Sequence, residues 1–120
     1  MTSYVVLLPG DETEWAATPP EYKQEMYALH AQFAKLLAER GHQVTGGAEL
    51  APSTEARVLR TSSDGQHTVT QGPYAETAEQ VTGFYVIETE DVEDLVDVCK
   101  ILGKGERAIE IRQCVGGGPE

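Results

Sequence analysis

A chain of 120 residues is long enough to fold as one domain with its own hydrophobic core. Nine basic residues stand against twenty acidic ones, which gives a formal charge of −11. A chain this acidic repels phosphate backbones and anionic lipid surfaces, so neither nucleic acid nor a membrane is expected among its partners.

The two cysteines are too few for a disulfide framework. Cys99 and Cys114 have neither CxxC spacing nor a matching histidine cluster, so we expect no metal and no cofactor. The N-terminus leads into a short apolar run without a basic stretch or a long apolar segment. A cytoplasmic protein without signal peptide or membrane span is therefore expected.

The first third of the chain predicts a strand and a long helix. Apolar residues 4–8 predict a buried strand that ends at Pro9 and Gly10, and a loop follows over 11–18. Residues 19–40 then carry apolar side chains at steps of three and four, which is typical of an amphipathic helix. Gly41 is placed to close it.

The middle of the chain predicts a strand and a hairpin. Residues 43–50 form the strand, and Gly46-Gly47 inside it indicates a bulge or a close approach of two backbones. Two β-prone runs, 56–61 and 66–70, then flank Asp64-Gly65, a pair typical of hairpin turns.

A turn at Gly72-Pro73 should end the preceding strand near Gln71, because proline lacks an N–H and restricts the residue before it. Glu76 and Glu79 are then expected on a short connection before strand residues resume over 83–88. Loops held by a scaffold often carry binding groups.

The last third predicts a helix and a strand. Apolar residues from 92 to 102 form a second amphipathic helix that ends at Gly103, and acids within 88–94 suit its N-terminus. Residues 108–112 alternate as a final strand, and 116–120 form a disordered tail.

This order of elements amounts to two βαβ units with a hairpin inserted between them. Both helices should lie on one face of an antiparallel sheet, as in a ferredoxin-like sandwich. The other sheet face needs a cover that two helices cannot supply. We therefore predict an α+β fold, a ferredoxin-like sandwich with an inserted β-hairpin, and a homodimer with sheets face to face, forming a dimeric α+β barrel.

The run Thr-Gln-Gly-Pro-Tyr-Ala-Glu-Thr-Ala-Glu at 70–79, here called the signature run, resembles a signature of the YCII-related family, DGPF-type branch. In that branch the run is Thr-Asp-Gly-Pro-Phe-Ala-Glu-Thr-Lys-Glu. Further patches of resemblance lie at 7–12 together with Trp15, at 26–33 and at 41–52. The resemblance implies the dimeric α+β barrel, one domain over 1–115, and no single established reaction.

The chain departs from that signature at three positions, Gln71, Tyr74 and Ala78. An amide at Gln71 can form hydrogen bonds but cannot exchange a proton near neutral pH. The departure therefore weakens an acid/base role at this position.

His30 is the leading candidate for catalysis. It falls at the margin of the apolar stripe of its helix, so its ring should be partly buried at the sheet. Some YCII-related members resemble this chain in carrying a helix histidine proposed to work with an aspartate. Asp11 and Glu12 are the carboxylates expected to reach it, with Asp11 as the catalytic partner, because the first loop leaves the strand end at which the helix turns back. The alternative is a packed boundary histidine.

We expect Glu12, Trp15, Gln71 and Glu76 to surround a substrate cleft next to His30 and Asp11. Trp15 is a lid over that cleft, a contact in the dimer, or an aromatic residue that only anchors a surface loop. His42 and His67 are predicted as surface residues.

Two functions remain open from the sequence. The resemblance implies a small cytoplasmic protein with a small-molecule cleft, working as a cofactor-free proton-transfer enzyme of lyase, isomerase or dehalogenase type. The alternative is a non-catalytic binding or regulatory domain with a protein partner, since DGPF-type proteins resemble domains associated with sigma-factor systems. An intact His30 with Asp11 favours the enzyme, and loss of the signature aspartate favours the alternative.

Overall fold

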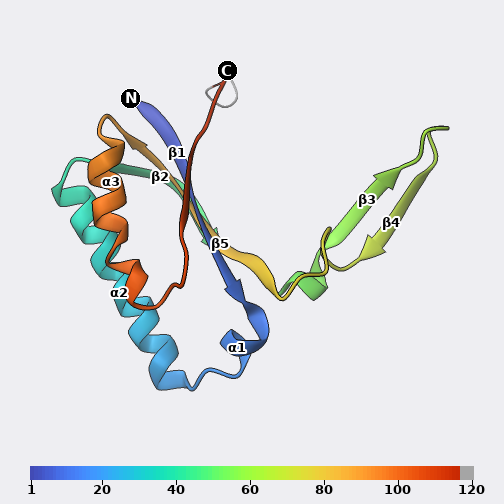
Figure 1. The fold of residues 1–120 in the computed structure, drawn as a ribbon, viewed down its shortest axis with the longest axis horizontal. Helices are drawn as coiled ribbons and strands as arrows, with labels where there is room; N and C mark the ends of the chain where they lie inside the picture. The colour runs from blue at the N-terminus through green and yellow to red at the C-terminus, as the bar shows by residue number, and fades with distance from the viewer. Residues whose placement is uncertain (117–120) are drawn as a thin grey trace.

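The computed structural model describes residues 1–116 and has two antiparallel sheets (Figure 1). The larger sheet has the strand order β2-β5-β1-β6, and the smaller one is the hairpin β3-β4. The strands are β1 (Thr2–Asp11), β2 (Gln43–Glu49), β3 (Arg57–Thr61), β4 (His67–Gln71), β5 (Glu79–Thr89) and β6 (Glu110–Gln113).

Three α-helices and two short 3₁₀ turns connect these strands. The connections are α1 (Glu12–Ala16), α2 (Pro20–Glu39), η1 (Ser53–Glu55), α3 (Val92–Cys99) and η2 (Leu102–Lys104). The predicted mixed α+β fold is confirmed. The predicted hairpin around Asp64-Gly65 is also present, and Gly65 has the positive φ of 85° that such a turn requires.

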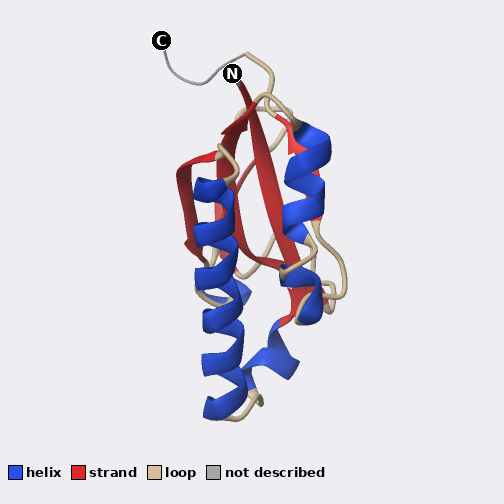
Figure 2. Cartoon of the chain, turned by 90° about the vertical axis from the view of Figure 1, so that its left-hand side faces the viewer, coloured by secondary structure: helices blue, strands red, loops and turns tan. Residues whose placement is uncertain are grey.

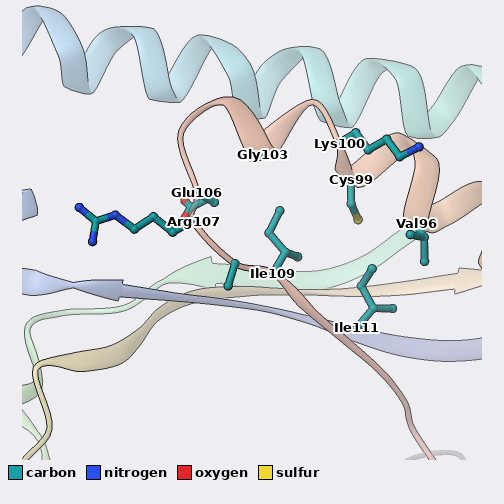
Figure 3. A pocket seen from close by; sticks show the side chains of 9 residues that line it. Val96, Cys99, Lys100, Gly103, Glu106, Arg107, Ile109 and Ile111 are labelled. Carbon is teal, nitrogen blue, oxygen red and sulfur yellow. The ribbon is translucent and has the colours of Figure 1, made fainter.

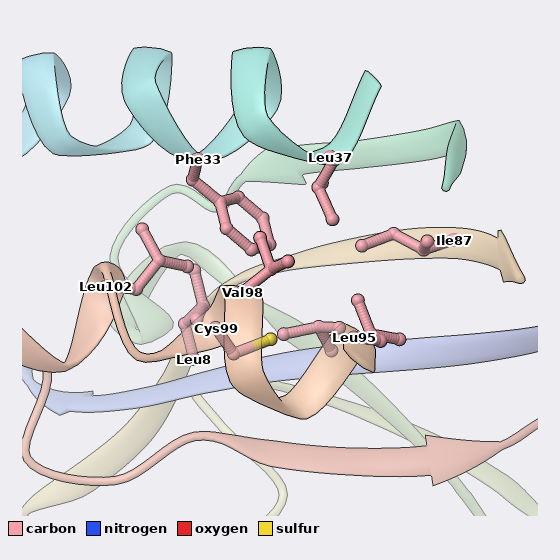
Figure 4. Packing of buried hydrophobic residues seen from close by; sticks show 9 residues of the cluster. Leu8, Phe33, Leu37, Ile87, Leu95, Val98, Cys99 and Leu102 are labelled. Carbon is pink, nitrogen blue, oxygen red and sulfur yellow. The ribbon is translucent and has the colours of Figure 1, made fainter. Parts of the chain in front are cut away.

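Helices α2 and α3 lie side by side on one face of the large sheet (Figure 2). Their apolar sides and the inward side chains of β1 and β5 form the core (Figure 4). The core residues are Val6, Leu8, Phe33, Leu37, Ile87, Leu95, Val98, Cys99 and Leu102.

The opposite face of the sheet is also apolar. Because side chains alternate along a strand, the neighbours of the core residues point away from the helices. Val5 faces Val86 in the register of β1 and β5, and Leu7 faces Phe84. These four side chains are half-buried, and within residues 1–116 they belong neither to the helix-side core nor to the apolar side chains packed against it. We call this surface the open face.

Several predicted boundaries were wrong. Strand β1 does not end at Pro9-Gly10 but continues to Asp11, because a register shift between Leu8 and Pro9 absorbs the missing N–H of the proline. Strand β5 begins at Glu79 rather than Gly83, so Glu79 lies on a strand and not on a loop. The predicted loop 11–18 contains the short helix α1.

The ends of the long helices agree with their sequence signals. Helix α2 begins at Pro20, and Gly41 follows its end with a φ of 82°. Asp91 caps α3 by accepting a hydrogen bond from the backbone N–H of Asp94. Helix α3 is shorter than predicted, because residues 102–104 form the separate turn η2.

Among residues 1–116, no helix combines the length and the apolar content needed to cross a membrane. The predicted tail 116–120 lies outside the described residues except for Gly116.

The paired glycines of β2 produce both features that the sequence indicated. The pairing of β2 with β5 shifts register between Val44 and Gly46, which is a bulge. At Gly47 the φ is 145°, and a Cβ there would lie 2.6 Å from the carbonyl oxygen of Phe84. The backbones therefore approach each other closely only because residue 47 lacks a side chain.

This geometry predicts that Gly47→Ala lowers the free energy of unfolding by about 1–3 kcal/mol. Gly46→Ala is the matched control, because a Cβ at Gly46 meets Val86 at an ordinary 3.7 Å and the residue has no positive φ. Urea denaturation of both variants measures the difference. Equal losses at the two positions would contradict this account of the bulge.

Candidate functional site

His30 lies half-buried between α2 and the sheet, as the helical pattern predicted. Its Nδ1 is 2.6 Å from the hydroxyl oxygen of Tyr85 on β5. The two rings stack with centroids 5.8 Å apart, and the Phe33 ring packs at a tilt against the Tyr85 ring with centroids 5.1 Å apart. Packing therefore fixes the orientation of both partners in the hydrogen bond.

Glu106 reaches the other nitrogen of the same ring. Its Oε1 is 4.0 Å from Nε2 of His30, and the two side chains are 21% and 25% exposed. The backbone of Glu106 is held by a 2.9 Å hydrogen bond to the carbonyl of Leu102. Gly105 lets this loop pass against α2, because a Cβ there would overlap Sδ of Met26.

Burial shifts the proton affinity of all three groups. It lowers the pKa of His30, although the negative charge of Glu49 opposes the shift. Burial raises the pKa of Glu106. Burial also raises the pKa of Tyr85, and the charge of Glu106 adds to this effect. Clustered shifts of this kind are typical of sites that move protons.

The arrangement can carry a proton between two side chains through the imidazole ring. When the ring hydrogen is on Nε2, the hydroxyl of Tyr85 donates to Nδ1 and the N–H faces Glu106. In the other tautomer, Nδ1 donates to the Tyr85 oxygen and Nε2 is free to accept a proton. A histidine held between a phenol and a carboxyl group is therefore poised for general acid or base chemistry.

Asp11, the expected partner of His30, has another role in the structure. Its Oδ1 accepts hydrogen bonds from the backbone N–H groups of Thr13 at 2.9 Å and Glu14 at 3.2 Å, which caps α1. Among residues 1–116, the polar groups in contact with His30 are those of Tyr85 and Glu106. The structure thus brings His30 together with a carboxylate from a different part of the chain.

The four predicted substrate-binding residues are distributed around the first loop and the hairpin base. Glu12 accepts hydrogen bonds from the backbone N–H and the hydroxyl of Ser53, at 2.7 and 2.5 Å. The Gln71 amide donates to the carbonyl of Thr54 at 3.2 Å. Glu76 is exposed. Glu12 and Gln71 therefore meet at η1, and their contacts tie the first loop to the hairpin base.

Trp15 packs edge-on against Tyr27 of α2 with ring centroids 5.9 Å apart. The ammonium group of Lys23 lies 5.2 Å from the centre of its ring. These contacts anchor α1 on the N-terminal part of α2.

A cavity of about 420 Å³ lies at the base of the hairpin, beside the signature run. Glu12 is the predicted site residue that lines it. The other lining residues are Leu50, Ala51, Pro52, Ser53, Glu55, Ala56, Pro73, Tyr74, Gln80 and Val81.

A smaller cavity of about 210 Å³ lies between α3, η2 and β6 (Figure 3). Cys99, Ile109 and Ile111 give it apolar walls, while Glu106 and Arg107 bring charge to it. Glu106 thus belongs both to the His30 cluster and to this cavity. Burial raises the pKa of the Cys99 thiol to about 11, which disfavours the reactive thiolate near neutral pH.

Comparison with known proteins identifies the family. The family model described as the YCII-related domain matches residues 2–112. The chain belongs to the YCII-related family. It is also similar to the uncharacterized protein R00369 of Rhizobium meliloti (strain 1021), with 32% identity over 99 residues, which cover 82% of this chain and 78% of that protein.

Two of the residues around His30 in this YCII-related domain were missed from the sequence. Tyr85 lies in a strand that was predicted, and its inward direction follows from the register of β5 opposite Val6. Glu106 lies in an irregular segment after η2, where no periodic pattern indicates which way a side chain points. Only the folded arrangement brings it to His30.

The prediction that His42 is a surface residue was wrong. Its side chain is 2% exposed, with Nδ1 2.7 Å from the hydroxyl of Thr89 and Nε2 2.7 Å from Oδ2 of Asp94. The hydrogen bond from His42 is the main reason why the pKa of Asp94 is lowered, and Arg40 lowers it further. His42 therefore joins the start of β2 to the start of α3. His67, in contrast, is exposed as predicted.

Among residues 1–116 of the YCII-related domain, no group of three or more His, Cys, Asp or Glu side chains is placed to hold a metal ion.

The buried histidine predicts that His42→Ala lowers the free energy of unfolding by about 1–3 kcal/mol, because Thr89 and Asp94 lose a shared partner. His67→Ala should change it by less than about 0.5 kcal/mol, since that side chain is on the surface. Chemical denaturation at neutral pH compares the two variants. A His42 variant as stable as the His67 variant would show that the buried contacts contribute nothing.

Proposed function

We propose that this YCII-related protein binds a small molecule and transfers a proton on it without a cofactor, as a lyase, isomerase or dehalogenase-type enzyme. The observation that carries the proposal is the 2.6 Å hydrogen bond between His30 Nδ1 and the Tyr85 hydroxyl, with Glu106 on the opposite nitrogen. The family assignment agrees with it but indicates no particular reaction. The comparisons do not favour the binding or regulatory alternative.

His30 is the proposed acid/base residue in this mechanism. Burial lowers its pKa, which leaves the ring neutral at pH 7 and able to accept a proton. Glu106, whose pKa is raised, lies 4.0 Å from Nε2, a separation that one bridging water spans, and it can exchange that proton through such a water. Glu106 fills the role that was expected of Asp11, and the proposed role of Asp11 is to order the first loop through its cap.

The small cavity is the proposed site of the reacting group. Glu106 lines it and is proposed to relay the proton between the ligand and His30, which lies behind Glu106 and does not line the cavity. The apolar walls of the cavity raise the proton affinity of Glu106. Glu12, Trp15, Gln71 and Glu76 are proposed contacts for a larger ligand near the hairpin base. Of these, Glu12 lines the cavity there.

The protein is further proposed to be a homodimer in the cytoplasm, of the DGPF-type branch. A homodimer that brings two open faces together would bury Val5, Leu7, Phe84 and Val86 from each copy. Apolar residues on both faces of a sheet are typical of a sheet that is covered on both sides. A ferredoxin-like sandwich paired in this way is a dimeric α+β barrel.

The proton-transfer proposal predicts that His30→Gln lowers turnover by roughly two to four orders of magnitude, the usual contribution of a general acid or base. The ligand is first found by screening metabolites for those that raise the melting temperature. Turnover of wild type should rise as pH increases through a value below the usual 6.5, because the pKa of His30 is lowered. Tyr85→Phe should weaken turnover and shift this pH profile.

His67→Gln is the matched control, since it removes an exposed histidine. Circular dichroism verifies that each variant keeps its fold. If the His30→Gln variant converted a confirmed substrate at the wild-type rate, the catalytic proposal would be wrong.

The dimer proposal predicts that the wild-type chain sediments as a dimer at micromolar concentration. Val86→Asp should shift it to the monomer, because an aspartate at the centre of the open face would be buried without a partner. Val115→Asp is the control, since Val115 is 87% exposed and lies outside the sheet. A monomeric wild type would contradict the dimeric barrel.

A further inference from the structure

The hairpin of residues 56–71, here called the arm, extends away from the rest of the molecule (Figure 1). At its base the N–H of Gly72 donates to the carbonyl of Ala56 at 2.7 Å, and the Gln71 amide donates to the carbonyl of Thr54 at 3.2 Å. Leu59 and Val69 face each other across its two strands, and each is 63% exposed. Their side chains therefore form an apolar patch at the middle of the arm.

The two faces of the arm differ. On the face opposite to the patch, Arg60 donates to the hydroxyl of Thr70 at 3.0 Å and lies 5.9 Å from the ring centre of Tyr74. The Arg60 side chain and Tyr74, which follows the arm, therefore partly cover that face. Because side chains alternate along a strand, the face with Leu59 and Val69 also presents Arg57, which is exposed.

A two-stranded hairpin is at best marginally stable alone in water. Exposed apolar pairs and open strand edges also favour contact with another surface. The arm therefore gains order if a surface packs on its Leu59–Val69 face.

The overall dimensions show that the chain exposes more surface than a compact domain of the same length. The radius of gyration is 16.5 Å, whereas a compact domain of this length has about 14 Å. The accessible surface is 8281 Å², whereas a compact monomer of this mass exposes about 6,300 Å². The excess of about 2,000 Å² exceeds the roughly 800 Å² that each partner contributes to a standard interface.

Charge indicates what the partner is. Of the nine basic and twenty acidic residues in the chain, the arm contains two arginines and one aspartate. The arm is thus slightly basic, while the remainder of the chain is strongly acidic. The body of a second copy offers the acidic surface that complements Arg57.

We propose that the arm of each protomer packs its Leu59–Val69 face against the body of a second copy of this chain, so that two arms clasp the dimer. The inference rests on the homodimer proposed above and adds a second contact to the open face. Closed two-fold symmetry requires both arms to make the same contact, which doubles the contribution of every arm residue.

The test combines sedimentation with hydrogen exchange on the full chain. The double variant Leu59→Asp/Val69→Asp should raise the dimer dissociation constant by about 100-fold or more, because four apolar side chains leave the two contacts. Val115→Asp, which changes a still more exposed valine outside the arm, should leave it unchanged. In wild type, the amides of β3 and β4 should become more protected as protein concentration rises through the dissociation constant.

Two results would overturn the proposal. In the first, the double variant dimerises with wild-type affinity and the amides of the arm exchange rapidly at every protein concentration. This result would eliminate the clasp and leave the open-face dimer intact. A wild-type chain that stays monomeric would eliminate both. Circular dichroism of the double variant shows whether α2 and α3 are intact, and Arg57→Glu gives a milder variant that should weaken the dimer through charge alone.

Discussion

The structure depends on a four-stranded antiparallel sheet that has helices on one face only. The core is formed on that face, where Val6 and Ile87 meet Phe33 and Leu37 of α2. This packing sets the register of β1 and β5, because a slip by one residue would turn every side chain to the other face. Both the candidate site on the helical side and the apolar open face follow from this register.

The same register explains why His30 has its particular neighbours. Tyr85 stands opposite Val6 in β1 and opposite Gly47 in β2, so its ring points toward α2. Its Cα also lies 3.1 Å from the position of a Cβ at Gly47. Tyr85 thus contacts the glycine bulge of β2 through its backbone and His30 through its hydroxyl group.

The sequence predicted the elements whose signals are local. The apolar stripe of α2, the Asp64-Gly65 turn and the Gly46-Gly47 bulge each depend on a few neighbouring residues, and each is present. Helix α1 also has a local signal that was overlooked, since Asp11 followed by glutamates is typical of a capped N-terminus.

What the sequence could not provide depends on contacts between distant segments. The passage of β1 beyond Pro9 needs the bulge opposite β5, and the burial of His42 needs Thr89 and Asp94. Half-burial of His30 was predicted from its helical position. Its partner was not, because Glu106 is 76 positions further along the chain in a segment without periodicity.

The two cysteines lie in contrasting environments. Cys99 is 4% exposed in the core, and its thiol has a pKa of about 11, while Cys114 is half-buried just after β6. Alkylating reagents attack the thiolate, so Cys99 reacts slowly while it is buried and faster when the layer between α3 and the sheet opens. The rate at which Cys99 is alkylated, followed separately from that of Cys114, therefore reports how often the core of this protein opens, without any mutation.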